Sequence, residues 1–251
     1  VAGPGFINFR IKKDYLISQV EQIGNDARLG LEKSSAPQKI LVDFSSPNLA
    51  KEMHVGHLRS TIIGDSIARF LEFEGHDVIR QNHVGDWGTQ FGMLIQYIRE
   101  EMPQALENPQ DFKIANLEEF YRASKKRFDE SEDFANAARK AVVALQSGDE
   151  ATLAVWTVFC EASLNHCREI YEIMDIKIED RGESAYNDML PVVVEELKEA
   201  GHAVLTQGAW GVFLDGYKNE QDEPLPTIVQ ISDGGYIYAT TDLAAIRYRM
   251  T

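Results

Sequence analysis

Cysteine is scarce in this sequence: two residues among 251 cannot supply the disulfide framework of a small secreted protein. Cys160 and Cys167 lie seven positions apart in a segment with a helical pattern. At about 1.5 Å of rise per residue their Cα atoms are roughly 10 Å apart, too far for a disulfide. No Cys-x-x-Cys pair is present, so we expect no zinc site. We expect two packed free thiols in a protein of the reducing cytoplasm.

Long apolar runs are also missing, and basic residues are few. No stretch approaches the roughly 18 residues of a membrane helix, and VAGPGFINF does not resemble a secretory signal, so we expect no membrane partner. The chain has 25 Lys and Arg against 40 Asp and Glu, a formal charge of −15, which on its own argues against a nucleic-acid partner. However, residues 90–200 hold 12 basic and 23 acidic side chains, whereas residues 1–89 hold 10 and 11. The acidity is therefore concentrated in the middle of the chain and does not exclude RNA.

What is present is the pattern of an α/β protein. An apolar run at 39–44 predicts a buried strand, residues 55–74 a helix, and residues 78–81 a second strand. A strand, a helix and a strand in this order form a right-handed βαβ unit with a Rossmann-like parallel sheet. We expect Gly75 to end the helix. Its predicted apolar stripe includes the following residues: Ile63, Ile67, Phe70 and Leu71.

The remaining segments predict two insertions into this unit. Residues 91–174 have a charged helical pattern, interrupted near Pro103, Pro109 and Gly148, which predicts a helical insertion. Farther along, short strands with Gly and Asn turns predict a small β-rich insertion. The other expected strands are 6–9, 176–178, 203–205, 212–214, 227–230 and 236–238, and the other expected helices are 14–28, 189–200 and a last one from about Thr241. That last helix has no stop signal, so we expect an excised piece of a longer protein.

The residues most suggestive of chemistry are His54-Val55-Gly56-His57, where a loop meets the long helix after the first strand. Ligands of open α/β sheets bind beyond the carboxyl ends of the strands, and a helix N-terminus attracts phosphate. Both imidazoles can donate to phosphate oxygens, Gly56 lets a base or ribose approach the backbone, and Lys51 can add a charge. By themselves these residues equally fit a structural pair of half-buried histidines, and a metal site is a third reading.

The surrounding sequence resolves these alternatives by resemblance. Residues 43–61, DFSSPNLAKEMHVGHLRST, resemble the signature region of the class I aminoacyl-tRNA synthetases, and more narrowly that of the arginyl-tRNA synthetases. The runs NHVGDWGTQFG at 82–92, LQSGD at 145–149 and GES at 182–184 extend the likeness to essentially the whole chain.

The resemblance implies ATP-dependent activation of L-arginine to arginyl-adenylate and transfer of the arginyl group to tRNA(Arg). The expected cofactors are ATP, as a substrate, and the Mg²⁺ that accompanies it; the expected state is a cytoplasmic monomer when intact. The implied domains are a remnant of an N-terminal domain with a linker (1–38), the first βαβ part of the catalytic domain (39–92), a helical insertion (93–165), a return to the catalytic domain (166–188), a small α+β insertion (189–235) and a truncated catalytic segment (236–251). The second half of the nucleotide fold and its lysine loop have no room here, so we expect the isolated piece to bind ATP or arginine weakly and to catalyse little.

The resemblance also assigns the site residues. It implies that Lys51, His54, Gly56 and His57 bind ATP, with His54, His57 and Lys51 catalytic. For arginine it implies Asp43, Ser46, Asn48, His57, Tyr238 and Asp242. Glu183, Asp86 and Gln90 are further candidates, and no metal ligand is implied. From the residues alone, Tyr238 also fits a sheet-surface aromatic, Asp242 a helix-start acid, Glu183 a solvated turn acid and Trp87 a core anchor.

Three other functions compete. A different nucleotidyltransferase with the same His-x-Gly-His signature is one, although the acidic insertion and Asp86-Trp87-Gly88 argue against it. A non-catalytic, synthetase-like module that binds RNA is the second, and it would be expected to lose the signature His or Lys. A zinc hydrolase is the most distant. The charged run at Lys125–Arg127 is most simply a solvated helix face, with an acceptor-stem contact as its alternative.

Overall fold

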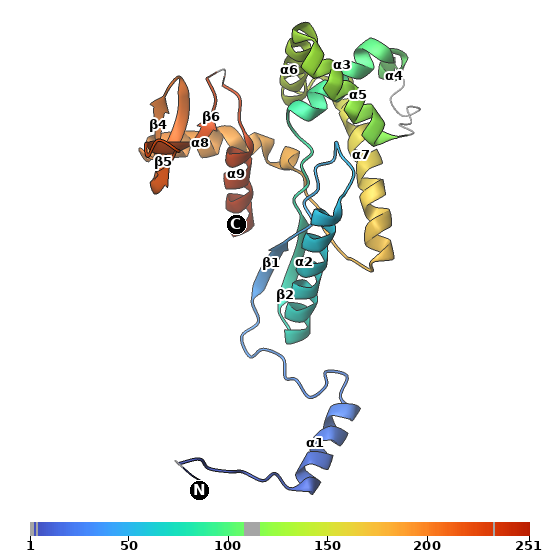
Figure 1. Ribbon diagram of the computed structural model, residues 1–251, viewed down its shortest axis with the longest axis vertical. Coiled ribbons are helices and arrows are strands. Elements are labelled where there is room, and N and C mark those ends of the chain that lie inside the picture. The colour runs from blue at the N-terminus through green and yellow to red at the C-terminus, as the bar shows by residue number, and fades with distance from the viewer. Residues whose placement is uncertain (1–2, 4, 108–115, 233) are drawn as a thin grey trace. The chain divides into compact units, whose positions relative to one another are not determined.

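The computed structural model describes residues 3, 5–107, 116–232 and 234–251, which fall into two compact units. One unit comprises 1–42 and 66–79, and the other comprises 43–65 and 80–251. Figure 1 labels most of the helices and strands. Each unit is described by itself below.

The first unit begins with an irregular segment and one helix. The expected strand at 6–9 is wrong, because residues 7–12 form no regular element. Helix α1 spans Lys13–Asn25 and so ends earlier than the expected 28. The Asp26 carboxylate accepts hydrogen bonds from the N–H groups of Arg28 and Gly30, both at 2.9 Å, and Leu29 and Gly30 have positive φ. The turn formed by Asp26 and the following residues replaces a further turn of helix, so α1 ends before residue 28.

The predicted βαβ unit is confirmed. Strands β1 (Lys39–Asp43), β2 (Asp77–Asn82) and β3 (Glu179–Asp180) lie in the order β1-β2-β3, and helix α2 (Val55–Glu74) connects the first two. The pair β2–β3 is parallel. Gly75 ends α2 at φ +97°, as expected. The strand expected at 176–178 is wrong: the pairing falls on Glu179 and Asp180, where the Asn82 side chain donates to Asp180 at 2.8 Å.

Helix α2 does not bury the stripe predicted for it. Ile63, Ile67 and Phe70 are about half exposed, and the buried positions are instead Thr61, Gly64, Asp65 and Ala68. Gly64 explains the difference, because a Cβ there would lie 2.2 Å from the Cβ of Phe44. The helix therefore approaches the loop after β1 through small and polar residues, an arrangement that hydrophobic periodicity does not reveal.

The predicted helical insertion is present, and its core reaches the loops of the sheet. Its helices are α3 (Thr89–Glu101), α4 (Gln104–Glu107), α5 (Leu117–Glu130), α6 (Glu132–Gln146) and α7 (Glu150–Ile173). The side chains of Asn116, Ser131 and Asp149 cap α5, α6 and α7. The expected break at Pro109 lies outside the described residues, and the expected boundary at 165 falls within the continuous α7.

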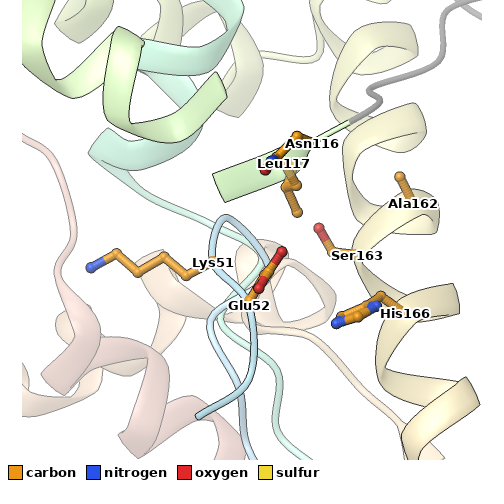
Figure 2. Close-up of a pocket in the computed structure, with 7 residues that line it drawn as sticks. All are labelled: Lys51, Glu52, Asn116, Leu117, Ala162, Ser163 and His166. Carbon is orange, nitrogen blue, oxygen red and sulfur yellow. The ribbon is translucent and has the colours of Figure 1, made fainter. Parts of the chain in front are cut away.

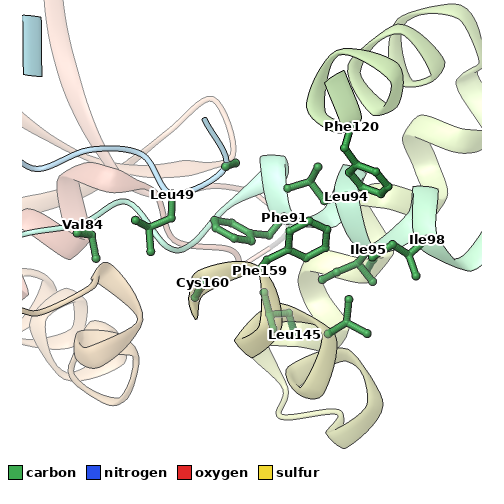
Figure 3. Close-up of a cluster of buried hydrophobic side chains, with 13 residues drawn as sticks. Leu49, Val84, Phe91, Leu94, Ile95, Ile98, Phe120, Leu145, Phe159 and Cys160 are labelled. Atoms are coloured by element: carbon green, nitrogen blue, oxygen red, sulfur yellow. The ribbon is translucent and has the colours of Figure 1, made fainter. Parts of the chain in front are cut away.

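One hydrophobic cluster joins Leu49 and Val84, from the loops after β1 and β2, to Phe91, Leu94 and other residues of the bundle (Figure 3). Cys160 belongs to this cluster, and both cysteines are free and buried, as expected. Burial raises the pKa of Cys167 to about 11, so this thiol is unreactive at neutral pH. In the described part of the chain, no helix is both long enough and apolar enough to cross a bilayer.

The last part combines a short 3₁₀ helix, an antiparallel sheet and two helices. The 3₁₀ helix η2 spans Glu183–Met189, α8 spans Leu190–Glu199, β4 spans Ala203–Thr206, β5 spans Ala209–Lys218, β6 spans Pro224–Gln230 and α9 spans Tyr238–Met250. The strand expected at 236–238 is wrong, because Tyr238 is already the first residue of α9. Ala244 and Ala245 pack against Tyr186 and Leu190, and the Thr240 hydroxyl donates to the Val229 carbonyl. These contacts favour the helix over the strand propensity of Tyr-Ile-Tyr.

Candidate functional site: the loops after the first two parallel strands

The loop after β1 has an unusual backbone at its first two residues. Ser45 and Ser46 both take positive φ, at 69° and 49°, a region that residues with a Cβ rarely adopt. The N–H of Ser46 donates to the Asn82 side-chain oxygen at 2.9 Å, and this bond helps to hold the turn. Strain of this kind, about 1 kcal/mol or more per residue, persists where the surroundings over-determine the backbone.

A buried polar network provides that constraint. The Ser45 hydroxyl bonds the Tyr171 hydroxyl at 2.7 Å and accepts from Thr61 at 2.9 Å, while the Asn82 amide donates to Tyr171 at 3.3 Å. Burial raises the pKa of Tyr171 to about 12, so it stays a neutral hydrogen-bonding group. Sequence reasoning did not assign a role to these residues, although Ser45 and Thr61 lie in the first signature run and Asn82 opens the second; Tyr171 lies outside both runs.

The loops after β1 and β2 lie side by side. The N–H of Leu49 donates to the Gly85 carbonyl, and the N–H of Gly85 donates to the Pro47 carbonyl, both at 3.0 Å. A Cβ on Gly85 would lie 3.4 Å from the Asn48 side-chain nitrogen, an ordinary van der Waals distance, so the two loops are in contact here. The side-chain oxygen Oδ1 of Asn48 accepts a hydrogen bond from the N–H of Ala50 at 3.0 Å. Two runs that are separate in sequence therefore form one surface beyond the strand ends.

The two histidines stand together at the start of α2. Their rings stack with centroids 3.8 Å apart and an interplanar angle of 23°. The backbone N–H of His54 donates to Nδ1 of His57 at 3.1 Å, and the N–H of Gly56 donates to Nδ1 of His54 at 3.1 Å. A Cβ on Gly56 would lie 2.8 Å from the His54 ring. Glycine at this position thus makes room for the His54 side chain as well as for a ligand.

These hydrogen bonds fix the chemistry of both imidazoles. Because each Nδ1 accepts a backbone N–H, a neutral ring carries its proton on Nε2 and presents that N–H as a donor. Burial and the neighbouring His54 lower the pKa of His57, which favours the neutral ring at physiological pH. The pair can therefore donate two hydrogen bonds to an anion without being charged.

Lys51 extends into a groove beside the histidines. A groove of about 410 Å³ is lined by Lys51, Glu52, Met53, His54, Glu118, Tyr121 and Arg122. The Lys51 ammonium lies 5.1 Å from the centre of the Tyr121 ring. A second pocket, of about 280 Å³, is lined by Lys51 and Glu52 as well as by Ser163 and His166; in Figure 2 the Lys51 side chain points away from Ser163 and His166, whereas Glu52 lies on their side. The Lys51 side chain therefore lies toward the groove that His54 also lines.

Tyr238 and Asp242 share one face of a helix. Because α9 begins at Tyr238, the two residues are separated by one helical turn. The Asp242 carboxylate lies 3.8 Å from Nε2 of His83, a residue that sequence reasoning quoted in the motif but did not assign to the site. Both His83 ring nitrogens are buried without a hydrogen-bond partner among the described residues. Burial lowers the pKa of His83, although the carboxylates of Asp43 and Asp242 oppose the shift.

Glu183 and Asp86 add two more carboxylates near Asp242. Asp86 is only 6% exposed, and it accepts hydrogen bonds from the N–H of Ser184 at 2.8 Å and from the Ser184 hydroxyl. Burial raises the pKa of Asp86. Burial and the nearby Asp86 and Asp242 charges raise the pKa of Glu183 to about 7. Acids that repel one another in this way are stabilised by a cation.

Gly182 is required by this contact. A Cβ on Gly182 would lie 2.0 Å from Oδ2 of Asp86, a buried carboxylate that holds the following turn. We predict that Gly182→Ala lowers the free energy of unfolding by about 2–3 kcal/mol, through overpacking and the loss of the Ser184 bonds. Denaturant unfolding measures this. Gly24→Ala, where a Cβ meets nothing within 4 Å, is the control and should be neutral or slightly stabilising. A Gly182→Ala value within 0.5 kcal/mol of wild type would contradict the prediction.

Asp43 has partners of its own within the chain. Its carboxylate accepts from the Ser46 hydroxyl at 3.2 Å and from the Arg249 guanidinium at 2.8 Å. Arg249 also donates through Nε to the Gln81 side chain at 2.7 Å. The predicted arginine residues Asp43 and Ser46 are therefore brought together, with an arginine of α9 already bound to the carboxylate.

Two further candidates lie toward the helical core. Trp87 packs against the hydrophobic cluster and meets Trp156 edge to face at 5.5 Å, which supports its reading as a core anchor. Gln90 is half-buried in the first turn of α3, and its side-chain oxygen has no hydrogen-bond partner in the described part. Within the described ranges, no group of three or more His, Cys, Asp or Glu side chains is arranged to hold a metal ion.

Comparison with known proteins identifies the family of the chain. Residues 19–251 match the family model described as "tRNA synthetases class I (R), catalytic domain". The chain is 57% identical over 250 residues to the arginine--tRNA ligase of Synechococcus elongatus, and 57% identical over 252 residues to that of Pseudomonas putida. The alignment with the Synechococcus enzyme includes 100% of this chain, and the alignment with the Pseudomonas enzyme includes 99% of it. In both cases it covers 43% of the relative's length.

Solved structures give the same result. The arginyl-tRNA synthetase of Plasmodium falciparum superimposes with a TM-score of 0.77 at 40% identity, covering 96% of this chain and 42% of that one. The Thermus thermophilus arginyl-tRNA synthetase, at 20% identity and a TM-score of 0.64 over 97% of this chain and 40% of that one, shares the fold.

The parallel sheet, the histidine pair at the start of α2 and the family match over residues 19–251 define the catalytic domain of a class I tRNA synthetase, and the chain belongs to this family. Within the class, the matching model is that of the arginine group. The chain spans less than half the length of its curated relatives.

Proposed function

We propose that this chain supplies the arginine-activating part of an arginine--tRNA ligase. The substrates are ATP, L-arginine and tRNA(Arg), and the protein is a cytoplasmic monomer. The proposal rests on the neighbouring carboxylates of Asp86, Glu183 and Asp242 together with the stacked His54–His57 pair at the start of α2. Carboxylates can bind a planar guanidinium in bidentate fashion, and imidazole N–H groups can bind phosphate.

In the proposed reaction, an oxygen of the arginine carboxylate bonds to the α-phosphorus of ATP. The bond from that phosphorus to the bridging oxygen breaks, and pyrophosphate leaves with the electron pair. The Nε2–H groups of His54 and His57 donate to phosphate oxygens as negative charge develops, and Lys51 adds a positive charge in the same groove. Ser46 and Asn48 are proposed to hold the amino-acid end of arginine. A ribose hydroxyl of tRNA(Arg) then attacks the arginyl carbonyl, and AMP leaves.

Mg²⁺ is proposed to arrive with ATP. An ion that accompanies ATP would be bound largely through the nucleotide's phosphate oxygens. Bound there, the ion would neutralise charge on the leaving pyrophosphate. We assign no residue of this chain to it.

The side chain of arginine is proposed to lie against Tyr238, Asp242 and Glu183. Tyr238 is 73% exposed, which leaves its ring available to stack on a guanidinium plane. Asp242 and Glu183 supply the opposite charge. Asp86 fixes the turn that carries Glu183, through its bonds to Ser184, and so acts as a positioning residue.

The test is a chimera in which residues 19–251 replace the matching segment of the Synechococcus elongatus enzyme. We expect exchange of pyrophosphate into ATP with arginine but not with lysine or citrulline. Lysine lacks the planar fork, and citrulline lacks the charge. A folded chimera without arginine-dependent exchange would overturn the proposal. The chain alone is assayed in the same exchange reaction. It is expected to give little exchange, even when tRNA is present.

Glu183 makes arginine binding depend on pH. Because its pKa is raised to about 7, Glu183 is mostly protonated at pH 6 and mostly ionised at pH 8. Only the ionised form attracts the guanidinium, so the affinity for arginine should rise roughly tenfold from pH 6 to pH 8. NMR titration of the chain with arginine measures this change. Glu183→Gln should remove most of the pH dependence, and an equally steep profile in that variant would contradict the assignment.

The raised pKa of Glu183 also affects the stability of the fold, which it makes higher at low pH, whereas arginine affinity is higher at high pH. Burial raises the pKa of folded Glu183 and so keeps it protonated up to about pH 7, whereas the unfolded group loses its proton near the ordinary pKa of 4.5. This contribution to stability is therefore complete below pH 4.5 and is lost as the pH rises through 7.

A further inference from the structure

The run LQSGD at 145–149 has no part in the proposed reaction, and it lies where α6 ends and α7 begins. Together with Trp87 and Ser184, which come from two other runs that resemble the family, it lines a pocket of about 460 Å³. This volume is within the range of small-molecule sites, about 300–1,000 Å³. Among the described residues, none lines both this pocket and the groove beside the histidines. The pocket is therefore a separate cavity.

Two tryptophans supply flat apolar surface to this pocket. The indoles of Trp87 and Trp156 line it and meet edge to face, with ring centroids 5.5 Å apart. Nε1 of Trp156 donates to the Asp86 carbonyl at 2.6 Å, whereas Nε1 of Trp87 is buried without a hydrogen-bond partner among the described residues. Indole faces stack on flat rings, and nucleobases are the commonest flat rings that also carry hydrogen-bond acceptors.

Two side-chain amides supply polar groups to the same pocket. Gln146 and Asn187 are half-buried, and in the described part of the chain neither side chain records a hydrogen bond. The hydroxyls nearby are already engaged, because Ser147 donates to the Ala144 carbonyl and Ser184 donates to Asp86. An amide presents a donor and an acceptor side by side, which matches the acceptor N7 and the donor N6 of adenine.

The charge of the lining excludes phosphate. All the lining residues lie in the described part, and Asp188 is the single charged side chain among them. Asp188 is exposed, so water screens its carboxylate, and a phosphate would meet no Lys or Arg here. The triphosphate of ATP therefore fits the groove of Lys51 and His54 and not this pocket. The lining favours an uncharged, flat ring with a hydrogen-bonding edge.

We propose that this pocket binds the adenine ring of an adenosine, stacked against Trp87 and Trp156 and hydrogen-bonded at its edge by Gln146 and Asn187. Two sources supply that chemistry: a free nucleoside, or an unpaired adenosine in an RNA strand whose phosphates remain outside the pocket. The proposed arginine activation does not use this site. The inference therefore stands or falls independently of the proposed function.

The three tryptophans of the chain provide the readout. NMR titration with adenosine, without arginine or ATP, follows the three indole N–H signals, each assigned with a Trp→Phe variant. We expect the signals of Trp87 and Trp156 to shift along one saturation curve, whereas Trp210, which lies in β5, stays unchanged as the internal reference. No shift up to about 10 mM adenosine, or equal shifts of all three signals, would overturn the proposal.

Amide variants test the edge contacts. Gln146→Ala and Asn187→Ala should each weaken adenosine about three- to tenfold, the usual effect of losing a neutral hydrogen bond. Gln22→Ala is the matched control, because Gln22 is an exposed helical amide of α1, and it should leave the affinity unchanged. Inosine, which has a carbonyl in place of the 6-amino group, should bind the wild type about threefold more weakly or worse. Wild-type affinity in both amide variants would overturn the assignment.

Other ligands separate this pocket from the proposed active site. If ATP moves the same two indoles and binds tenfold or more tightly than adenosine, the pocket is an ATP site and the proposal fails. It also fails if arginine shifts these indoles more than adenosine does. Short oligonucleotides then decide the source of the ring. Oligoadenylate binding more tightly than adenosine, with oligouridylate inert, identifies an RNA strand, and equal affinity of oligoadenylate and adenosine identifies the free nucleoside.

Discussion

Replacing His57 by asparagine should lower the rate of arginine-dependent pyrophosphate exchange by roughly 100- to 1,000-fold, the usual effect of removing one preorganised donor from a developing charge. Asparagine suits the test because its side-chain oxygen can still accept the His54 N–H that now bonds Nδ1 of His57. The start of α2 is thereby preserved, while the Nε2–H donor is lost. The chimera described above, at saturating arginine and ATP, is the appropriate enzyme.

Glutamine at position 57 provides the matched control. Its longer side chain can carry an N–H donor near the position of Nε2, so His57→Gln should retain more activity than His57→Asn. Thermal unfolding of both variants should stay close to that of the parent. Equal and near-complete activity in the two variants would remove His57 from the proposed mechanism.

The second large effect is expected at Asp242. Asp242→Asn keeps the shape of the side chain but removes its charge, and we expect the affinity for arginine to fall at least about 30-fold, or about 2 kcal/mol. The reason is that a desolvated guanidinium loses its carboxylate partner, whereas citrulline, being uncharged, should bind the variant about as well as it binds the wild type. Titration of the chain with both ligands measures the two effects separately.

Asp215→Asn is the control for the change in net charge. Asp215 lies exposed in β5 and belongs to the small antiparallel sheet. Its replacement should leave arginine affinity unchanged. If Asp215→Asn and Asp242→Asn weaken arginine equally, the effect is one of general electrostatics, and Asp242 is no specific ligand.

The local parts of this fold were accessible from sequence. Helix α2 was predicted with its bounds, because residues 55–74 are bracketed by a loop and by Gly75. The helical and β-rich insertions were likewise predicted from pattern and turn residues. The face that α2 buries was not, since Gly64 and Thr61 are small or polar and depend on Phe44 and Ser45 for their burial.

The start of α9 shows why the site was predicted only in part. Tyr236-Ile237-Tyr238 has high strand propensity, and the contacts that make Tyr238 helical come from Tyr186 and Leu190, about fifty residues earlier. The pairing of Asp43 with Arg249 spans 206 positions and leaves no trace in local pattern. His54 and His57 were accessible because their geometry depends on adjacent residues alone.

The backbone of Ser45 and Ser46 has a practical consequence for protein engineering. If residues 43–61 are grafted into another scaffold, the Ser45 hydroxyl loses its hydrogen bond to Tyr171, because Tyr171 lies 126 positions away on α7. The sequence of residues 43–61 alone is therefore not expected to reproduce the turn in another protein. Grafts that carry Tyr171, Thr61 and Asn82 in matching places should keep the turn, and shorter grafts should relax out of it.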